Sequence, residues 1–247
     1  MQNRFNQTYK IPYEGIKTDL TLSFAKLMFL FQETAIAHTN STVKPMKWYS
    51  ENRLGFVLTN WDVKVLNYPA LYEEMTVYTW PLFFKGIMAQ RFFQAFDKGG
   101  NEIAYANTKW VFSDLEAKKP ARIPAEISDS YGGTYSSPHE PDFNFPETEA
   151  FKLVNSRQTI TRRSDIDSNW HVNNVKYIEW ALDCVPDDIY ASGNITQMKT
   201  KYKKELRQNE EILLETYTKG EEIIILVKSG EDFEVLNAEI YFGLTKS

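Results

Sequence analysis

Cysteine is nearly absent from this chain, since Cys184 is the single one among 247 residues. An intrachain disulfide is therefore impossible, and a reducing compartment is expected. The first ten residues are polar and lack the apolar core of a signal peptide. The most apolar run, Phe24–Phe31, is interrupted by Lys26 and is too short to span a bilayer. We expect a cytoplasmic protein without a membrane span.

An excess of basic charge is also lacking. The 28 Lys and Arg residues are outnumbered by 33 Asp and Glu, which gives a formal net charge of −5 and a pI near 5.4. General nucleic-acid binding usually needs a strongly basic face, so it is not expected. No Gly-x-Ser-x-Gly motif occurs, which argues against a serine hydrolase. No second His or Cys lies at ligand spacing from His171, so neither a metal nor another cofactor is expected.

Proline is concentrated in one segment. Such a segment cannot hold a long helix or a central strand, and a connection of this length is usually a linker or a functional loop. We interpret residues 116–150 as an interdomain linker between an N-terminal domain, 1–115, and a C-terminal domain, 151–247. Five of the ten prolines lie in the segment, together with Gly132-Gly133: Pro120, Pro124, Pro138, Pro141 and Pro146.

The two flanks of this segment share an order of elements. Each begins with a short extended run and a helix, and each continues with β-rich runs, so we infer an internal repeat. An offset of 150 positions aligns the start of the first helix, Thr21–Lys26, with His171–Lys176. The expected elements are 7–12, helix 22–37, 56–66, 76–84, 88–96 and 102–113, and then 158–163, helix 172–185, 196–206, 212–218, 222–227 and 233–242.

One helix followed by antiparallel strands predicts a sheet wrapped around that helix. The first helix is apolar nearly all round, as expected of a helix enclosed by protein, at Leu27, Met28, Phe29, Leu30 and Phe31. The second has a narrower stripe at spacings of three and four, which is typical of core packing. The predicted class is α+β, and the predicted fold is a tandem (double) hot-dog, in which each half is an antiparallel sheet wrapped around a central helix.

The most informative segment runs from Arg162 to Asn174, between a predicted strand and the second predicted helix. Free N–H groups at a helix start favour developing negative charge, as in the oxyanion formed during thioester hydrolysis. Asp167, Asn169 and His171 alternate, so in an extended segment all three would project to one side. A carboxylate or imidazole can deprotonate an attacking water, and an amide can orient it. Asp and Asn before a helix are also common caps, and that interpretation stays open.

The first half lacks this combination of side chains. At the offset of 150, the matching positions are Lys17, Asp19 and Thr21. The other two histidines are His38, at the end of the first predicted helix, and His139, in the proline-rich segment. Neither has a comparable polar cluster beside it in the sequence. This asymmetry predicts that only one half is catalytic.

Two stretches resemble the acyl-acyl carrier protein thioesterases of plant plastids and bacteria. The first runs from Ser164 through an Asp-x-Asn-x-His-Val-Asn-Asn core to Trp180. The second runs from Thr79-Trp80-Pro81 through Arg91 to Arg122-Ile123-Pro124. The resemblance covers nearly the whole chain. It implies a tandem hot-dog fold whose N-terminal half holds the acyl chain and whose C-terminal half performs the chemistry.

The resemblance also implies site residues. The family's catalytic Asp, Asn and His fall on Asp167, Asn169 and His171, and a further carboxylate falls on Glu205. The family cysteine that follows this carboxylate is Leu206 here, so activated water is favoured over a thiol nucleophile. We expect a polarised water to attack the thioester, but which group is the general base stays open.

Glu205 is the least secure member of this set. Strict alternation along a strand would place it on one face with Lys199, Lys201 and Lys203, unless the strand bends or ends there. These lysines, with Lys204, Arg207, Arg162 and Arg163, are also candidate contacts for an acidic carrier protein. Charge runs on strands are usually just a solvated face.

The implied activity is hydrolysis of fatty acyl-acyl carrier protein to free fatty acid and carrier protein, in fatty acid biosynthesis. Leu27, Met28, Leu30 and Phe31 are candidate acyl-pocket residues, and plain core packing is the alternative. Two other functions stay open: a hot-dog thioesterase acting on coenzyme A esters, and a non-catalytic acyl-binding hot-dog protein. Nothing matches the motifs of hot-dog dehydratases. The sequence does not determine chain-length preference or whether a homodimer forms.

Overall fold

The fold is described from a computed structural model that covers residues 4–246, with the backbone alone at residues 191, 192 and 246. The chain forms two compact units. Unit 1 comprises Met1–Thr59 and Val63–Pro141, and unit 2 comprises Asn60–Asp62 and Asp142–Ser247. The division after Pro141 falls inside the proline-rich segment. No helix within residues 4–246 combines the length and apolarity needed to cross a membrane.

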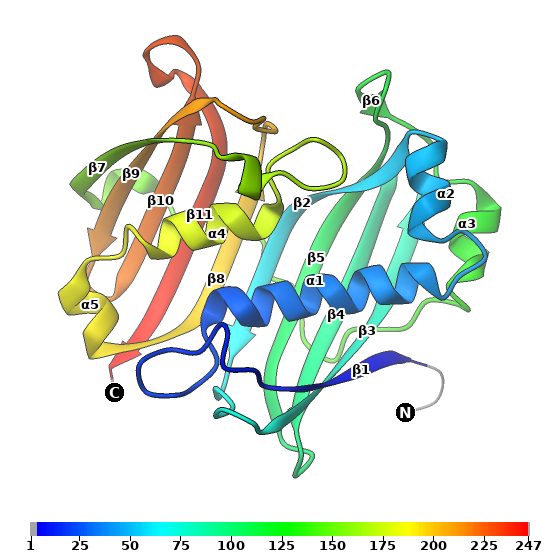
Figure 1. Cartoon of the computed structure of the whole chain (residues 1–247), viewed down its shortest axis with the longest axis horizontal. Coiled ribbons are helices and arrows are strands. Elements are labelled where there is room, and N and C mark those ends of the chain that lie inside the picture. The colour runs from blue at the N-terminus through cyan, green and yellow to red at the C-terminus, as the bar shows by residue number, and fades with distance from the viewer. Residues whose placement is uncertain (1–3, 247) are drawn as a thin grey trace. The chain divides into compact units, whose positions relative to one another are not determined.

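Unit 1 is built on a sheet with the strand order β1-β3-β4-β5-β2 (Figure 1). The pairs β1–β3, β3–β4 and β4–β5 are antiparallel, and the two-residue strand β6 pairs with β5. Its strands are β1 (Phe5–Lys10), β2 (Leu54–Val65, of which residues 60–62 belong to unit 2), β3 (Glu74–Lys85), β4 (Met88–Asp97), β5 (Glu102–Asp114) and β6 (Lys119–Pro120). Its helices are α1 (Phe24–Asn40), α2 (Met46–Glu51) and α3 (Ala125–Ser130).

Unit 2 repeats the plan with the strand order β8-β11-β10-β9-β7, again antiparallel throughout. Its strands are β7 (Lys152–Ile160), β8 (Gly193–Tyr202), β9 (Glu211–Lys219), β10 (Glu222–Ser229) and β11 (Val235–Lys246). Its helices are α4 (Asn174–Leu182) and α5 (Asp187–Ser192), with short 3-10 turns η1 (Thr148–Ala150), η2 (Arg163–Asp165) and η3 (Glu231–Phe233). One helix on an antiparallel sheet in each unit confirms the α+β class.

Helix α1 packs on the sheet of unit 1 through one face. It begins after Ser23, whose hydroxyl caps the helix by accepting from the Lys26 N–H. Phe31 is fully buried and stacks on Phe93 of β4, with 5.3 Å between ring centroids. Phe29, however, is 37% exposed. The expectation that α1 is enclosed on all sides was therefore wrong, because one face remains at the surface.

The proline-rich segment covers the sheet face of unit 1 opposite α1. Phe93 faces α1, so the neighbouring Phe92 and its cross-strand partners face the other way. There, the His139 ring stacks 3.7 Å from the Tyr105 ring, and its Nε2 lies 3.0 Å from Glu102 Oε1. Trp80 Nε1 donates to the Ser136 carbonyl at 3.4 Å. This part of the segment therefore packs against the sheet. We call residues 136–145 the strap.

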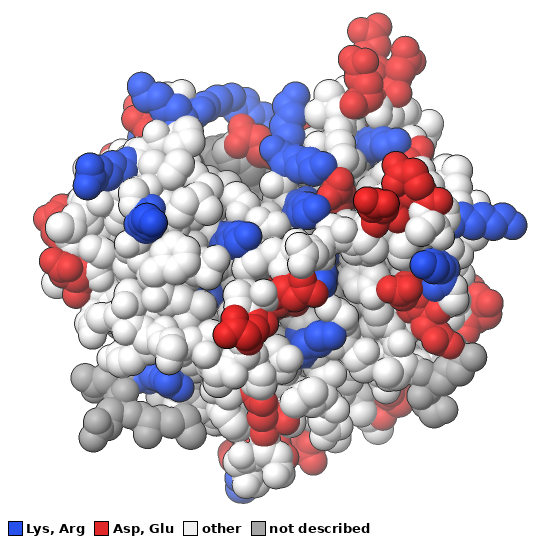
Figure 2. All heavy atoms as spheres, turned by 180° about the vertical axis from the view of Figure 1, so that it is seen from behind, with Lys and Arg blue, Asp and Glu red and all other residues white. Residues whose placement is uncertain are grey.

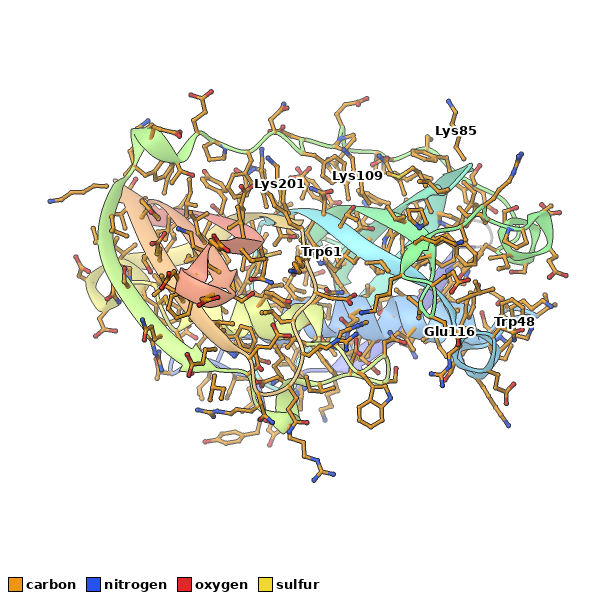
Figure 3. The ribbon with its side chains drawn as sticks, turned by 90° about the horizontal axis from the view of Figure 1, so that it is seen from above. Trp48, Trp61, Lys85, Lys109, Glu116 and Lys201 are labelled. Carbon is orange, nitrogen blue, oxygen red and sulfur yellow. The ribbon has the colours of Figure 1, made fainter. Side chains whose placement is uncertain are left out.

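The strap continues on the sheet of unit 2. Lys199 of β8 is 7% exposed, and its ammonium donates to Asp142 Oδ2 at 2.5 Å and to the Asn144 carbonyl at 2.8 Å. Lys201, which is labelled in Figure 3, places its ammonium 4.9 Å from the centre of the Phe145 ring. These two lysines therefore hold the strap in place. The candidacy of the buried Lys199 as a carrier contact was wrong. The side chain of Lys201 is 36% exposed, so its candidacy stays a prediction.

Candidate active site

His171 lies in a tight loop that precedes α4. Ile166 and Val172 form an antiparallel bridge, and inside it the Asp167 N–H donates to the His171 carbonyl at 2.8 Å. The Trp170 N–H donates to the Asp167 carbonyl at 3.1 Å, and Trp170 has a φ of 63°. A bulky residue in the left-handed region is unusual and marks a sharp reversal of the chain. The expected extended arrangement, with three side chains on one side, was therefore wrong.

Asp167 stabilises this loop with its side chain. Its Oδ1 accepts from the Asn169 N–H at 2.7 Å and from the His171 N–H at 3.4 Å. The helix cap is instead Asn173, whose Oδ1 accepts from the Val175 N–H at 2.9 Å. Asp167 thus caps the loop and not the helix. Asn169 is exposed at the loop tip.

The structure brings Glu205 to His171. The Glu205 Oε1 atom lies 3.2 Å from His171 Nε2, and the two side chains are 45% and 21% exposed. Strand β8 ends at Tyr202, because the N–H groups of Lys203 and Lys204 both turn to the Asn237 carbonyl, at 2.8 and 3.2 Å. Glu205 therefore lies outside the strand, and the alternation with the lysines does not apply to it.

Two backbone contacts hold the loop against the segment that carries Glu205. The Val172 N–H donates to the carbonyl of Leu206 at 2.9 Å. Tyr177 of α4 is 3% exposed and forms a hydrogen bond with the Leu206 backbone. Burial raises the pKa of Tyr177, and the negative charges of Glu210 and Glu205 raise it further, so its hydroxyl stays protonated. Tyr177 is thus an uncharged, buried residue that contacts the segment next to Glu205.

Comparison with known proteins assigns the family. A model described as the acyl-ACP thioesterase N-terminal domain matches residues 2–131, and one described as the acyl-ACP thioesterase C-terminal domain matches residues 149–239. The chain belongs to the acyl-ACP thioesterase family.

Two curated relatives of this family come from plants. The chain is 27% identical over 216 residues to Acyl-[acyl-carrier-protein] hydrolase FATB3, chloroplastic, of Cuphea viscosissima, which covers 83% of this chain and 52% of the relative. It is 28% identical over 167 residues to Oleoyl-acyl carrier protein thioesterase 2, chloroplastic, of Arabidopsis thaliana, covering 63% of this chain and 45% of the relative. The chain therefore spans about half the length of the curated relatives it matches.

Solved structures of acyl-ACP thioesterases share the fold. An acyl-ACP thioesterase from Bacteroides thetaiotaomicron superposes with a TM-score of 0.84 at 22% identity, covering 98% of each chain. The 12:0-ACP thioesterase from Umbellularia californica gives a TM-score of 0.85 at 21% identity, covering 100% of this chain and 99% of the other. These likenesses confirm the expected tandem hot-dog fold.

Within this member of the acyl-ACP thioesterase family, the candidate acyl-pocket residues lie apart in sequence from the candidate catalytic residues. Leu27, Met28, Leu30 and Phe31 belong to α1 of unit 1 and are at most 5% exposed. Asp167, Asn169, His171 and Glu205 belong to unit 2. The four α1 residues are part of the core of their unit, as the packing alternative also expects.

The remaining ionisable groups have structural surroundings. Cys184 is 4% exposed, and burial raises the pKa of its thiol, which disfavours a nucleophilic thiolate. The other two histidines have charged neighbours that are distant in sequence: His38 Nδ1 lies 3.1 Å from Arg91 Nη1, and His139 contacts Glu102. Within residues 4–246, no three His, Cys, Asp or Glu side chains are arranged to hold a metal ion.

Reasoning from the sequence missed two residues of this site. Tyr177 lies one position away from the apolar stripe of its helix, so its place in the sequence does not mark it as a site residue. Asn237 bends the chain ahead of Glu205, yet it lies inside a predicted strand. The signal that could have identified Asn237 is its polarity between Leu236 and Ala238, because a buried amide in an apolar strand is uncommon.

Proposed function

We propose that this chain is a thioesterase that hydrolyses fatty acyl-acyl carrier protein to free fatty acid and carrier protein, in the cytoplasm. The observation that supports it most is the 3.2 Å contact between His171 Nε2 and Glu205 Oε1 beside the Asp167 loop. An imidazole oriented by a carboxylate is a common way to prepare a general base. Family membership supplies the class of substrate.

In the proposed mechanism, His171 is the general base. When its Nε2–H donates to Glu205, Nδ1 is left as the acceptor that can remove a proton from water. The water oxygen bonds to the thioester carbonyl carbon and forms a tetrahedral oxyanion, which N–H groups near the start of α4 and the Asn169 amide stabilise. The C–S bond then breaks, and the imidazolium returns the proton to the leaving thiolate. Asp167 holds the loop in shape throughout.

We assign acyl-chain binding to the N-terminal domain, residues 1–115, and the chemistry to the C-terminal domain, residues 151–247. Leu27, Met28, Leu30 and Phe31 are the proposed lining residues, because they form a continuous buried apolar face of α1. Apolar lining with few polar groups is the usual character of a pocket for a lipid chain.

The proposed carrier contacts are the exposed basic residues around the loop: Arg162, Arg163, Lys203, Lys204 and Arg207. An acidic carrier would be steered to such residues. The face shown in Figure 2 carries Lys and Arg side chains interspersed with Asp and Glu, and neither sign forms a continuous field there.

A hydrolysis panel tests this proposal. The same set of acyl chain lengths is presented on carrier protein and on coenzyme A, and release of free thiol is followed. Faster turnover of the carrier-bound esters supports the proposed function. Equal or faster turnover of the coenzyme A esters supports the acyl-CoA thioesterase alternative. Acyl binding without turnover of any ester supports the non-catalytic alternative.

A further inference from the structure

The two units use the same turn at corresponding places. In unit 1, the N–H groups of Leu66 and Asn67, which follow β2, both donate to the carbonyl of Ile103, at 2.8 and 3.1 Å. In unit 2, Lys203 and Lys204, which follow β8, donate in the same way to the Asn237 carbonyl, at 2.8 and 3.2 Å. Asn237 therefore occupies in unit 2 the place that Ile103 occupies in unit 1.

The side chains at these two places differ. Ile103 is 2% exposed and apolar, so the turn forms without a side-chain amide. Asn237 is fully buried, and its Nδ2 donates to the Lys204 carbonyl at a long 3.4 Å. Among residues 4–246, its Oδ1 has no hydrogen-bond partner. Burying an unsatisfied acceptor costs stability, and an apolar residue in this place would avoid that cost.

The carbonyl that Asn237 holds immediately precedes Glu205. On the other side of Glu205, the Leu206 carbonyl accepts from the Val172 N–H at 2.9 Å. The same anchor exists in unit 1, where the Leu22 N–H donates to the Pro69 carbonyl at 2.9 Å. This correspondence places Tyr68 where unit 2 has Glu205. The buried amide and the carboxylate thus occur together in unit 2, and both are missing from the matching positions of unit 1.

We propose that Asn237 is a positioning residue, which fixes Glu205 against His171 by holding the Lys204 carbonyl. This inference rests on the proposed function, in which Glu205 orients the imidazole. Catalytic groups must be held within about 0.5 Å of their productive geometry. Asn237 supplies that precision, whereas the turn itself needs only its backbone carbonyl.

A double-mutant cycle tests the inference. Asn237→Leu removes the amide at similar volume, and Glu205→Gln removes the carboxylate charge. We expect Asn237→Leu to lower kcat by about tenfold with KM unchanged, since a displacement of about 1 Å can cost up to ~100-fold. In the Glu205→Gln background, the same change should cost less than about twofold, because it acts through Glu205. Equal losses in both backgrounds, or no loss in either, overturn the inference.

A matched control is Asn107→Leu. Asn107 is also a fully buried strand asparagine without a described hydrogen-bond partner, but it lies on β5 of unit 1. It should retain kcat while changing thermal stability to a similar extent. If Asn237→Leu does not fold, Asn237→Ser, which also removes the amide, takes its place in the cycle, with the same outcomes expected.

The imidazole resonances give a second readout that does not depend on turnover. The chain has only three histidines, so replacing His38 and His139 in turn assigns the His171 signals in an 15N spectrum. We expect the Nε2–H tautomer of His171 to dominate in the wild type and to lose population in both Asn237→Leu and Glu205→Gln. An unchanged tautomer in Asn237→Leu overturns the inference. Absence of wild-type hydrolysis would instead refute the proposed function and leave this spectrum as the test of positioning.

Discussion

The loops at residues 16–22 and 166–172 follow the same backbone path and differ in their chemistry. Each is closed by a bridge, Ile16 to Leu22 and Ile166 to Val172. The Lys17 N–H donates to the Thr21 carbonyl at 2.8 Å, as the Asp167 N–H does to the His171 carbonyl. Leu20 and Trp170 both have a φ of 63°. The loop conformation therefore belongs to the fold, since it forms with and without the candidate catalytic side chains.

The polar side chains of the unit 1 loop form hydrogen bonds and an ion pair with one another. Burial alone would raise the pKa of Asp19, but hydrogen bonds from the Thr21 hydroxyl and N–H and the nearby Lys17 ammonium outweigh it, and the pKa falls to about 2. Lys17 also lies 4.9 Å from the centre of the Tyr68 ring. In unit 2, by contrast, the imidazole of the loop reaches a carboxylate on the neighbouring segment. The difference between the two loops lies in these side chains.

The largest expected effect comes from removing the base or the loop cap. His171→Ala should lower kcat by roughly 10²- to 10⁴-fold, the usual contribution of a positioned acid or base. Asp167→Ala removes the loop cap and should lower kcat by up to ~100-fold, the scale of a displacement of about 1 Å. Thr21→Ala and Asp19→Ala are the matched changes in the unit 1 loop and should retain turnover. Steady-state hydrolysis of one acyl-carrier substrate measures all four. Near-normal turnover by both unit 2 variants would contradict the assignment.

Glu205→Gln should have a smaller effect than loss of the imidazole. The variant keeps a hydrogen-bond acceptor for His171 Nε2 but loses the charge that stabilises the imidazolium, so kcat should fall by about 10- to 100-fold. Tyr68→Phe, at the corresponding place of unit 1, is the control. Paired kcat and KM values decide the point, because a merely local loss of packing would not leave KM unchanged. A Glu205→Gln enzyme with full kcat would exclude an orienting role.

The stability of the chain in acid should depend on a buried histidine of unit 1, His38. Burial, with a smaller contribution from the Arg91 charge, lowers the pKa of His38 to about 3 from its ordinary 6.5. Below pH 6.5, the unfolded chain therefore takes up a proton on His38 that the folded chain does not. The free energy of unfolding therefore decreases as the pH is lowered from 6.5 to about 3. The loss approaches roughly 1.4 kcal/mol per pH unit across that window.

Urea unfolding at pH 7 and at pH 4.5 measures this loss. The His38→Gln variant should show a shallower pH dependence than the wild type, even though its stability at pH 7 is lower. The control is His139→Gln, which removes a histidine that is partly exposed beside Glu102. If both variants keep the wild-type slope, the buried imidazole does not account for the acid sensitivity.

The element order and the offset between the halves could be predicted because hydrophobic periodicity is a local property. The offset of 150 that aligns Thr21 with His171 also relates the residues that form the matching hydrogen bonds in the two loops. The contact between Glu205 and His171 could not be derived in this way. It depends on the end of β8 at Tyr202, where the Lys203 and Lys204 N–H groups donate to the backbone carbonyl of Asn237, 33 positions away from Lys204.

The shape of the loop at residues 166–172 was mispredicted for a different reason. A left-handed residue is normally signalled by Gly, Asn or Asp, and here the position is Trp170. The sequence therefore predicted an extended conformation for this loop. The family resemblance nevertheless pointed to Asp167 and His171, because a motif carries the result of a folded geometry that periodicity cannot supply. The substitutions above test the individual roles of these residues.

The smallest expected effect concerns the charges that surround the loop of unit 2. Lys204 is exposed next to Glu205, and the corresponding turn residue of unit 1 is the uncharged Asn67. Lys204→Glu should raise KM for an acyl-carrier substrate by about two- to fivefold at low salt, the scale of a surface charge pair worth up to about 1 kcal/mol. KM for a small acyl thioester without carrier should not change, and Lys85→Glu, at the exposed end of β3 in unit 1 (Figure 3), should change neither. Equal increases in KM for both substrates would show that Lys204 affects the site itself. Carrier binding would then not be a property of the basic residues beside the unit 2 loop.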